Sequence, residues 1–184
     1  MGQRLNIEIR KDDKVLANAY YHWSGYTSSA LDLTDEILKN IDNVNFDNDV
    51  VRAVKLLEVT GAGLPSSEIE IINSCIRNIN FKKAIDRSEG FIAISEKEIE
   101  DTQCWEEARV EIHLDTQNII LNLYWDIDED DYDKDDLPNF YEATIDYKKV
   151  SFENFNSLKD EILENIKNKN YYFIYNNEKY GFIE

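Results

Sequence analysis

The chain opens with a strict alternation of apolar and polar residues. Leu5, Ile7 and Ile9 fall on one face of an extended segment, which predicts a half-buried strand because successive side chains of a strand point to opposite faces. The polar residues between them are Asn6, Glu8 and Arg10. Residues 12–13 predict a turn and residues 15–23 continue as a second strand, so we expect an N-terminal hairpin.

Helical spacing replaces this alternation after Gly25. Apolar residues recur at intervals of three and four positions from residue 27 to about residue 43, which is typical of a helix that buries one face. Thr27 or Ser28 is the expected N-cap, because a side-chain hydroxyl can accept a hydrogen bond from a free amide of the first turn.

Two further helices are expected in the first half. One follows Asp47 or Asn48 as its cap and ends before Gly61-Ala62-Gly63, which reads as a helix C-terminus and not as a phosphate-binding loop, because it follows a helix and not a strand. Another begins where Ser67 and Glu70 have the spacing of a capping box.

Beyond residue 90 the pattern is mainly that of strands. The expected strands and the final hairpin cover residues 91–94, 110–114, 119–125, 142–148, 171–175 and 179–183. A helix is expected from Ser151 onward. Because helices and strands are mostly segregated along the chain, we expect an α+β fold with antiparallel sheet and helices packed on one side. We expect a hairpin followed by a helix at both ends of the chain, which would allow two similar small halves.

A turn at residues 88–90 is the candidate boundary between two parts. Residues 1–88 would hold the N-terminal hairpin and three helices, and residues 89–184 an acidic sheet with a helix. A chain of 184 residues also fits one compact domain.

The charge is unevenly distributed between these parts. The chain carries a formal net charge of −18, of which −3 falls on residues 1–92 and −15 on residues 93–184. Such a surface repels anionic lipid and nucleic acid and attracts a basic partner. We therefore expect a cytoplasmic protein that binds neither nucleic acid nor membrane directly and meets a basic protein instead.

The segment from residue 126 to residue 136 concentrates the negative charge. The expected partner-binding residues are Asp126, Asp128, Glu129, Asp130, Asp131, Asp133, Asp135 and Asp136, with Trp125 and Tyr132 as aromatic anchors. Such a segment imitates the phosphates of a nucleic acid, and the polar face formed by Glu111, His113 and Asp115 would extend it, together with Glu96, Glu100 and Glu107. A solvated acidic loop that only aids solubility is the plain alternative.

The same segment offers a divalent-cation site as an alternative function. Asp131, Asp133, Asp135 and Glu142 have the spacing of calcium-loop positions 1, 3, 5 and 12. Asp136 stands where such a loop needs glycine, and the flanks predict strands and not helices. Calcium or magnesium is thus the only cofactor the pattern raises, and otherwise we expect none.

Other candidate chemistry is sparse, so we expect no enzyme. Residues 20–29 are rich in aromatic and hydroxyl side chains and could line a small-ligand site or simply pack against the first helix. His22 and His113 show no zinc spacing, and a pairing of either with Cys75 or Cys104 has no support from spacing. We expect both thiols to be reduced and partly buried.

The N-terminal part resembles small acidic proteins of phages and mobile elements from low-GC Gram-positive bacteria. The residues that carry this resemblance are Gln3–Ile7, Leu16–Ser24 and Ser28–Leu31. Several such proteins inhibit host defence, and they include anti-CRISPR proteins, some of which imitate DNA. The resemblance therefore implies an inhibitor of a host nucleic-acid-binding complex, acting in the host cytoplasm, and assigns no functional residue.

Overall fold

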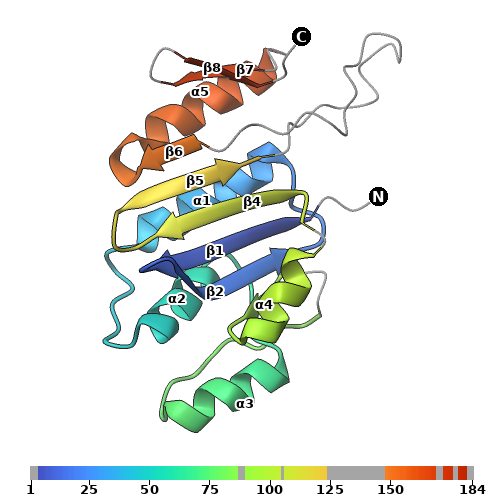
Figure 1. The fold of residues 1–184 in the computed structure, drawn as a ribbon, viewed down its shortest axis with the longest axis vertical. Helices are drawn as coiled ribbons and strands as arrows, with labels where there is room; N and C mark the ends of the chain where they lie inside the picture. The colour runs from blue at the N-terminus through green and yellow to red at the C-terminus, as the bar shows by residue number, and fades with distance from the viewer. Residues whose placement is uncertain are drawn as a thin grey trace.

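A mixed six-stranded sheet forms the centre of the structure, a computed structural model. It describes residues 4–86, 90–104, 106–123 and 148–168 in full, and the backbone of residues 172–175 and 178–181. The strands are β1 (Leu5–Lys11), β2 (Lys14–Tyr21), β3 (Phe91–Ala93), β4 (Ala108–His113), β5 (Asn118–Asn122) and β6 (Lys148–Ser151). Their order in the sheet is β3-β2-β1-β4-β5-β6, and only β1 and β4 pair in parallel. Figure 1 shows this arrangement.

The helices and a second, two-stranded sheet complete an α+β fold, which confirms the predicted class. The helical elements are α1 (Thr27–Asn40), α2 (Asp49–Glu58), α3 (Ser66–Cys75), α4 (Glu96–Gln103), the 3₁₀ turn η2 (Phe152–Asn154) and α5 (Phe155–Lys167). The small sheet pairs β7 (Tyr172–Tyr175) with β8 (Glu178–Gly181) as the expected C-terminal hairpin. Within the described ranges, no helix combines the length and the hydropathy needed to cross a bilayer.

The predicted N-terminal hairpin is present, with a two-residue turn between β1 and β2. Asp12 and Asp13 both have positive φ, at 50° and 60°, as a turn whose twist matches that of the flanking strands requires. Leu5, Ile7 and Ile9 are fully buried in the main core. The hairpin thus supplies β1, one of the two central strands of the sheet, and its neighbour β2.

The core lies between one face of the sheet and the helices α1, α2 and α5. Ile7 pairs with Ala19 on one side and with Val110 on the other, and all three side chains are buried. Figure 1 shows α1 and α2 behind the sheet and α4 in front of it. Helices therefore lie on both faces, where the sequence predicted one, because α4 was not expected.

Several element boundaries differ from the prediction. The side chain of Asn48 caps α2 as expected, accepting a hydrogen bond from the amide of Val51 at 3.0 Å. The hydroxyl caps predicted for α1 and α3 are wrong, since Tyr26 and Pro65 hold the N-cap positions and neither caps through its side chain. Ser151 ends β6 and also holds the N-cap position of η2, which leads directly into α5, so the helical region expected from Ser151 onward is present.

The sheet joins strands from both sides of the expected boundary near residue 88. β3 pairs with β2, and β4 pairs with β1 over six residues. The N-terminal hairpin lies inside the six-stranded sheet, between β3 and β4, whereas the C-terminal hairpin forms a sheet of its own.

Candidate functional site

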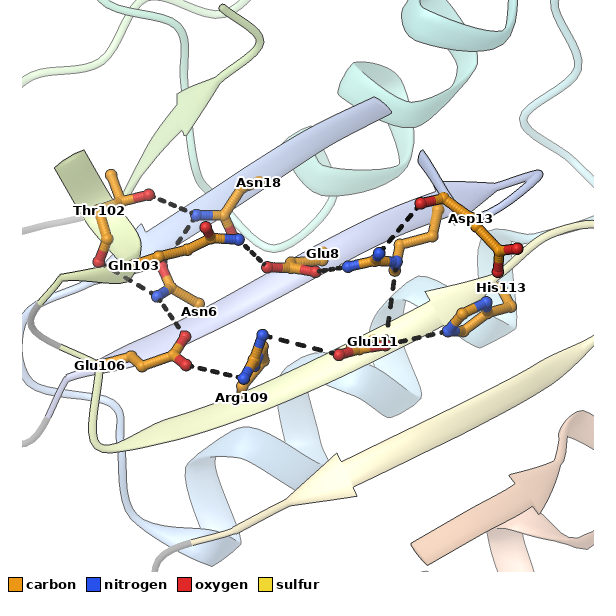
Figure 2. Close-up of polar contacts among 11 residues, drawn as sticks. Asn6, Glu8, Asp13, Asn18, Thr102, Gln103, Glu106, Arg109, Glu111 and His113 are labelled. Carbon is orange, nitrogen blue, oxygen red and sulfur yellow. Dashed lines mark hydrogen bonds and ion pairs between the residues drawn. The ribbon is translucent and has the colours of Figure 1, made fainter. Parts of the chain in front are cut away.

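A connected group of polar side chains occupies the sheet face opposite the core. Asn6, Glu8 and Arg10 of β1 point to this face because they alternate with the core residues of the same strand. β2, β4 and the end of α4 add the remaining members, which with Glu106 are Asn18, Arg109, Glu111, His113, Thr102 and Gln103. Figure 2 shows how these side chains point toward one another. We call this group the polar array.

Two buried asparagines join the sheet to α4. The Asn18 side-chain amide donates to Asn6 Oδ1 at 2.9 Å and to Thr102 Oγ1 at 2.7 Å. The Asn6 amide donates to the Thr102 carbonyl oxygen at 3.2 Å and to Glu106 Oε2 at 3.0 Å. These hydrogen bonds hold α4 against the sheet through polar contacts. The other helices are held mainly through apolar side chains.

Glu8 is fully buried and satisfied by two donors. Arg10 Nη1 lies 2.5 Å from Glu8 Oε2, and Gln103 Nε2 donates to Glu8 Oε1 at 2.5 Å. A carboxylate so far from water is tolerated only when it is paired and hydrogen-bonded. The sequence pattern placed Glu8 on a solvent-facing side, and this expectation is wrong because α4 and neighbouring side chains cover it.

Glu111, the acidic member on β4, is surrounded by nitrogen-bearing side chains. His113 Nε2 lies 3.1 Å from Glu111 Oε2, while Arg10 and Arg109 approach Glu111 at 3.9 and 3.8 Å. Arg109 also pairs with Glu106 at 3.0 Å. Burial raises the pKa of the Glu106 carboxyl despite the opposing effects of Asn6 and Arg109.

Positive and negative groups in the polar array are nearly equal in number. Few of its buried polar atoms lack a hydrogen-bond partner within the described ranges. Three carboxylates face two guanidinium groups and one imidazole. Asn18 Oδ1 and Arg10 Nε are buried and find no hydrogen-bond partner among the residues that the structure describes. Because the charges mostly neutralise one another, the array acts as a polar joint between β1, β2, β4 and α4.

Glu111 therefore does not belong to an exposed acidic face. Its exposed fraction is 8% and it is paired within the fold, which corrects the expectation that Glu111 and His113 extend an acidic ridge. Asp115 accepts a hydrogen bond from the amide of Asp12 at 3.2 Å, which accounts for its lowered pKa. Glu107 accepts one from the amide of Arg4 at 2.7 Å.

The outer side of α4 carries part of the exposed negative charge of the described structure's second half, in addition to Asp115 and the exposed carboxylates of η2 and α5. Glu96, Glu100 and Asp101 are exposed, and no ion pair within the described ranges involves them. Ile99 and Thr102, on the inner side, are the two buried side chains of this helix. α4 thus lies between the polar array, whose carboxylates are paired, and a negatively charged outer surface.

The aromatic segment that follows β2 is ordered by its own contacts. The Tyr20 hydroxyl lies 3.1 Å from His22 Nδ1, and the rings of His22 and Trp23 meet edge-on at 4.6 Å. Trp23 is 59% exposed, and Tyr26 is exposed as well. Tyr21 instead points into the core, where burial raises the pKa of its hydroxyl and Thr60 is its hydrogen-bond partner.

The residues predicted for partner binding and for a cation lie outside the described residues. They are Trp125, Asp126, Asp128, Glu129, Asp130, Asp131, Tyr132, Asp133, Asp135, Asp136 and Glu142. In the part of the chain that is described, no group of three or more His, Cys, Asp or Glu side chains is arranged to hold a metal ion. Cys75 and Cys104 are free and exposed, where partly buried thiols were expected.

The polar array and α4 were both missed from the sequence. Residues 96–103 place one buried apolar residue, Ile99, among charged ones, so the apolar periodicity that marks a helix is nearly absent. The one available signal is the run of asparagine and glutamate at alternate positions of a central strand. Comparison of the chain with protein-family models, with curated proteins and with solved structures found no match.

Proposed function

We propose that this protein is an acidic interaction protein that occupies the nucleic-acid-binding surface of a host defence complex and so inhibits it. The observation that carries the proposal is the exposed carboxylates of α4. They have no ion-pair partner within the described ranges, whereas the carboxylates of the polar array are matched. Unmatched exposed charge raises the free energy of the folded state and is relieved when a basic partner binds.

The chemistry of the partner follows from this surface. Proteins that bind duplex DNA present lysine and arginine at the spacing of the phosphates. An acidic folded surface competes for the same groups, and charge complementarity speeds its association with them. The net charge of −18 supports this class of partner over nucleic acid or anionic lipid.

The resemblance of the N-terminal part to small acidic proteins of phages supports a role as an inhibitor of host defence. The acidic segment from Asp126 to Asp136 would supply further carboxylates for the same class of partner. The protein would act by occupying a surface and not by catalysis.

The experiment measures inhibition of DNA binding by purified CRISPR effector complexes in the presence of the protein. Wild type is expected to compete with DNA, and a rise in salt should weaken it. Glu96→Lys/Glu100→Lys and Asp131→Lys/Asp133→Lys/Asp135→Lys should each reduce inhibition at least tenfold, the scale of losing about 1.4 kcal/mol of binding free energy.

The matched control reverses charge on the other side of the sheet. Glu36→Lys/Asp42→Lys changes exposed carboxylates of α1 and the turn after it and should leave inhibition within about twofold, since rim charges far from a contact act weakly. Equal loss in the control and the test variants would show that only total charge matters. No competition by wild type against any basic nucleic-acid-binding complex would refute the proposed function.

A further inference from the structure

Trp23 is the most notable exposed side chain outside the polar array. It lies two residues beyond the end of β2 and is 59% exposed. Its ring is not loosely attached, because it meets His22 edge-on at 4.6 Å, and Tyr20 holds the His22 ring at Nδ1. A large aromatic ring is thus held in a defined position with much of its surface in water.

The aromatic group is joined to α4 through a small apolar cluster. The Tyr20 ring packs against Phe91 with 5.5 Å between centroids, and Tyr20 and Phe91 belong to the same cluster as Ile99 of α4. Figure 1 shows α4 beside the C-terminal end of β2, the end from which Trp23 follows. A chain of side-chain contacts therefore leads from Trp23 through His22, Tyr20 and the apolar cluster to Ile99, which directly precedes Glu100 and Asp101 in α4.

The combination favours one type of ligand group. The face of an indole attracts a cation more strongly than any other side-chain ring does. Guanidinium also stacks on aromatic planes and pairs with carboxylates through its fork of N–H groups, which a lysine ammonium cannot do. A nucleic-acid base could stack on Trp23, but its phosphates would meet the like charges of Glu100 and Asp101.

We propose that Trp23 and the α4 carboxylates form a docking surface for an arginine-bearing segment of a partner protein. One guanidinium covers the indole, and neighbouring arginines pair with Glu100 and Asp101. This inference rests on the proposed function and specifies which groups of the basic partner are recognised. It adds an aromatic contact to a surface that charge alone would leave unspecific.

The test uses a synthetic 12-residue peptide in which four arginines are separated by glycine and serine. Calorimetry measures its affinity for the full chain, and the indole N–H signal of Trp23 reports the contact by NMR. Trp23→Ala is expected to weaken binding about five- to tenfold, the range of a partly desolvated cation–π contact. Trp23→Phe should weaken it less, and replacing arginine with lysine in the peptide should weaken wild-type binding.

Matched controls separate this contact from general attraction. Ile85→Ala truncates another exposed apolar side chain, 85% exposed, and should leave affinity unchanged. Glu100→Gln/Asp101→Asn should weaken binding at least threefold more than Glu36→Gln/Asp42→Asn, which removes the same charge elsewhere. Circular dichroism and urea unfolding verify that each variant is folded.

Some outcomes contradict this inference and leave the proposed function intact. Trp23→Ala with wild-type affinity for the peptide, while the α4 charge variants still lose inhibition of the effector complex, would refute the aromatic contact alone. Binding of a single-stranded oligonucleotide that Trp23→Ala abolishes would assign the surface to bases and overturn the arginine proposal. Failure of the wild-type protein to inhibit any effector complex would refute the proposed function, whereas the peptide titration tests the arginine contact by itself.

Discussion

At the scale of single residues, the fold depends on charged side chains that lie away from water. Glu8 is fully buried in the middle of the sheet, and its two donors come from Arg10 of its own strand and Gln103 of α4. Burying a carboxylate is costly, and the cost is offset only while both donors remain. These residues therefore select one arrangement of α4 on the sheet.

Removing the partner of Glu8 should be more damaging than removing both. Arg10→Met is expected to lower the free energy of unfolding by about 3–5 kcal/mol, because it leaves a buried charge with one neutral donor. The double variant Glu8→Gln/Arg10→Met should recover part of this loss. Urea unfolding of wild type, both single variants and the double variant measures the coupling, and strictly additive losses would contradict it.

At the scale of elements, α4 is held by polar contacts at both of its ends. The buried carboxylate of Glu68 in α3 accepts hydrogen bonds from the amides of Ile94 and Ser95 at 2.6 and 2.8 Å, and from Ser95 Oγ at 2.8 Å. A negative charge at a helix N-terminus also suits the helix dipole. The far end of α4 is tied to the sheet through Thr102 and Gln103.

Glu68→Gln should loosen α4 more than the rest of the molecule. The amide replaces one accepting oxygen with a donor that faces other donors, so a loss of about 1–3 kcal/mol is expected. Hydrogen exchange should speed up in residues 94–103 first. Glu70→Gln, on the exposed side of α3, is the control and should change neither the free energy of unfolding nor the exchange rates of residues 94–103. Uniformly faster exchange across the chain in Glu68→Gln would contradict a local role for Glu68.

At the scale of the whole molecule, ion pairs join elements that are distant in sequence. Asp35 of α1 pairs with Lys159 of α5 at 2.6 Å, and Lys39 lies at the same distance from the same oxygen. Burial alone would raise the pKa of Asp35, but hydrogen bonds and charge from the two lysines outweigh it and lower the pKa below 3.8. The ionised carboxylate therefore stabilises the fold at neutral pH.

The contribution of Asp35 should disappear in acid. Since its pKa is lower in the folded chain than in the unfolded one, stability falls as the pH drops below 3.8 and through the lowered folded value. Asp35→Asn should cost about 1–3 kcal/mol at pH 6 and much less at pH 2.5. Urea unfolding at both pH values measures this, with the exposed Asp42→Asn as control. An equal cost of Asp35→Asn at both pH values would contradict the charge-based role.

Local patterns predicted the hairpins at both ends, the cap of α2, the strands β4 and β5, and the α+β class. Each depends on contacts between residues near one another in the chain, which is why alternation and helical spacing revealed them. β6 was missed because this strand is short and carries a single buried residue, Val150. The negative charge of residues 96–101 is visible in the sequence, but the sequence does not show that these residues form a helix over the sheet.

The sequence by itself determined the net negative charge, the N-terminal hairpin and the apolar faces that pack together, since these follow from composition and from the period of apolar residues. Only the tertiary structure decided which polar residues are buried. Parallel pairing of β1 with β4, and the seating of α4 over Asn6 and Asn18, bring together groups about 100 residues apart. Whether a carboxylate is matched or exposed depends on such neighbours, so Glu111 became part of the interior while Glu100 remained at the surface.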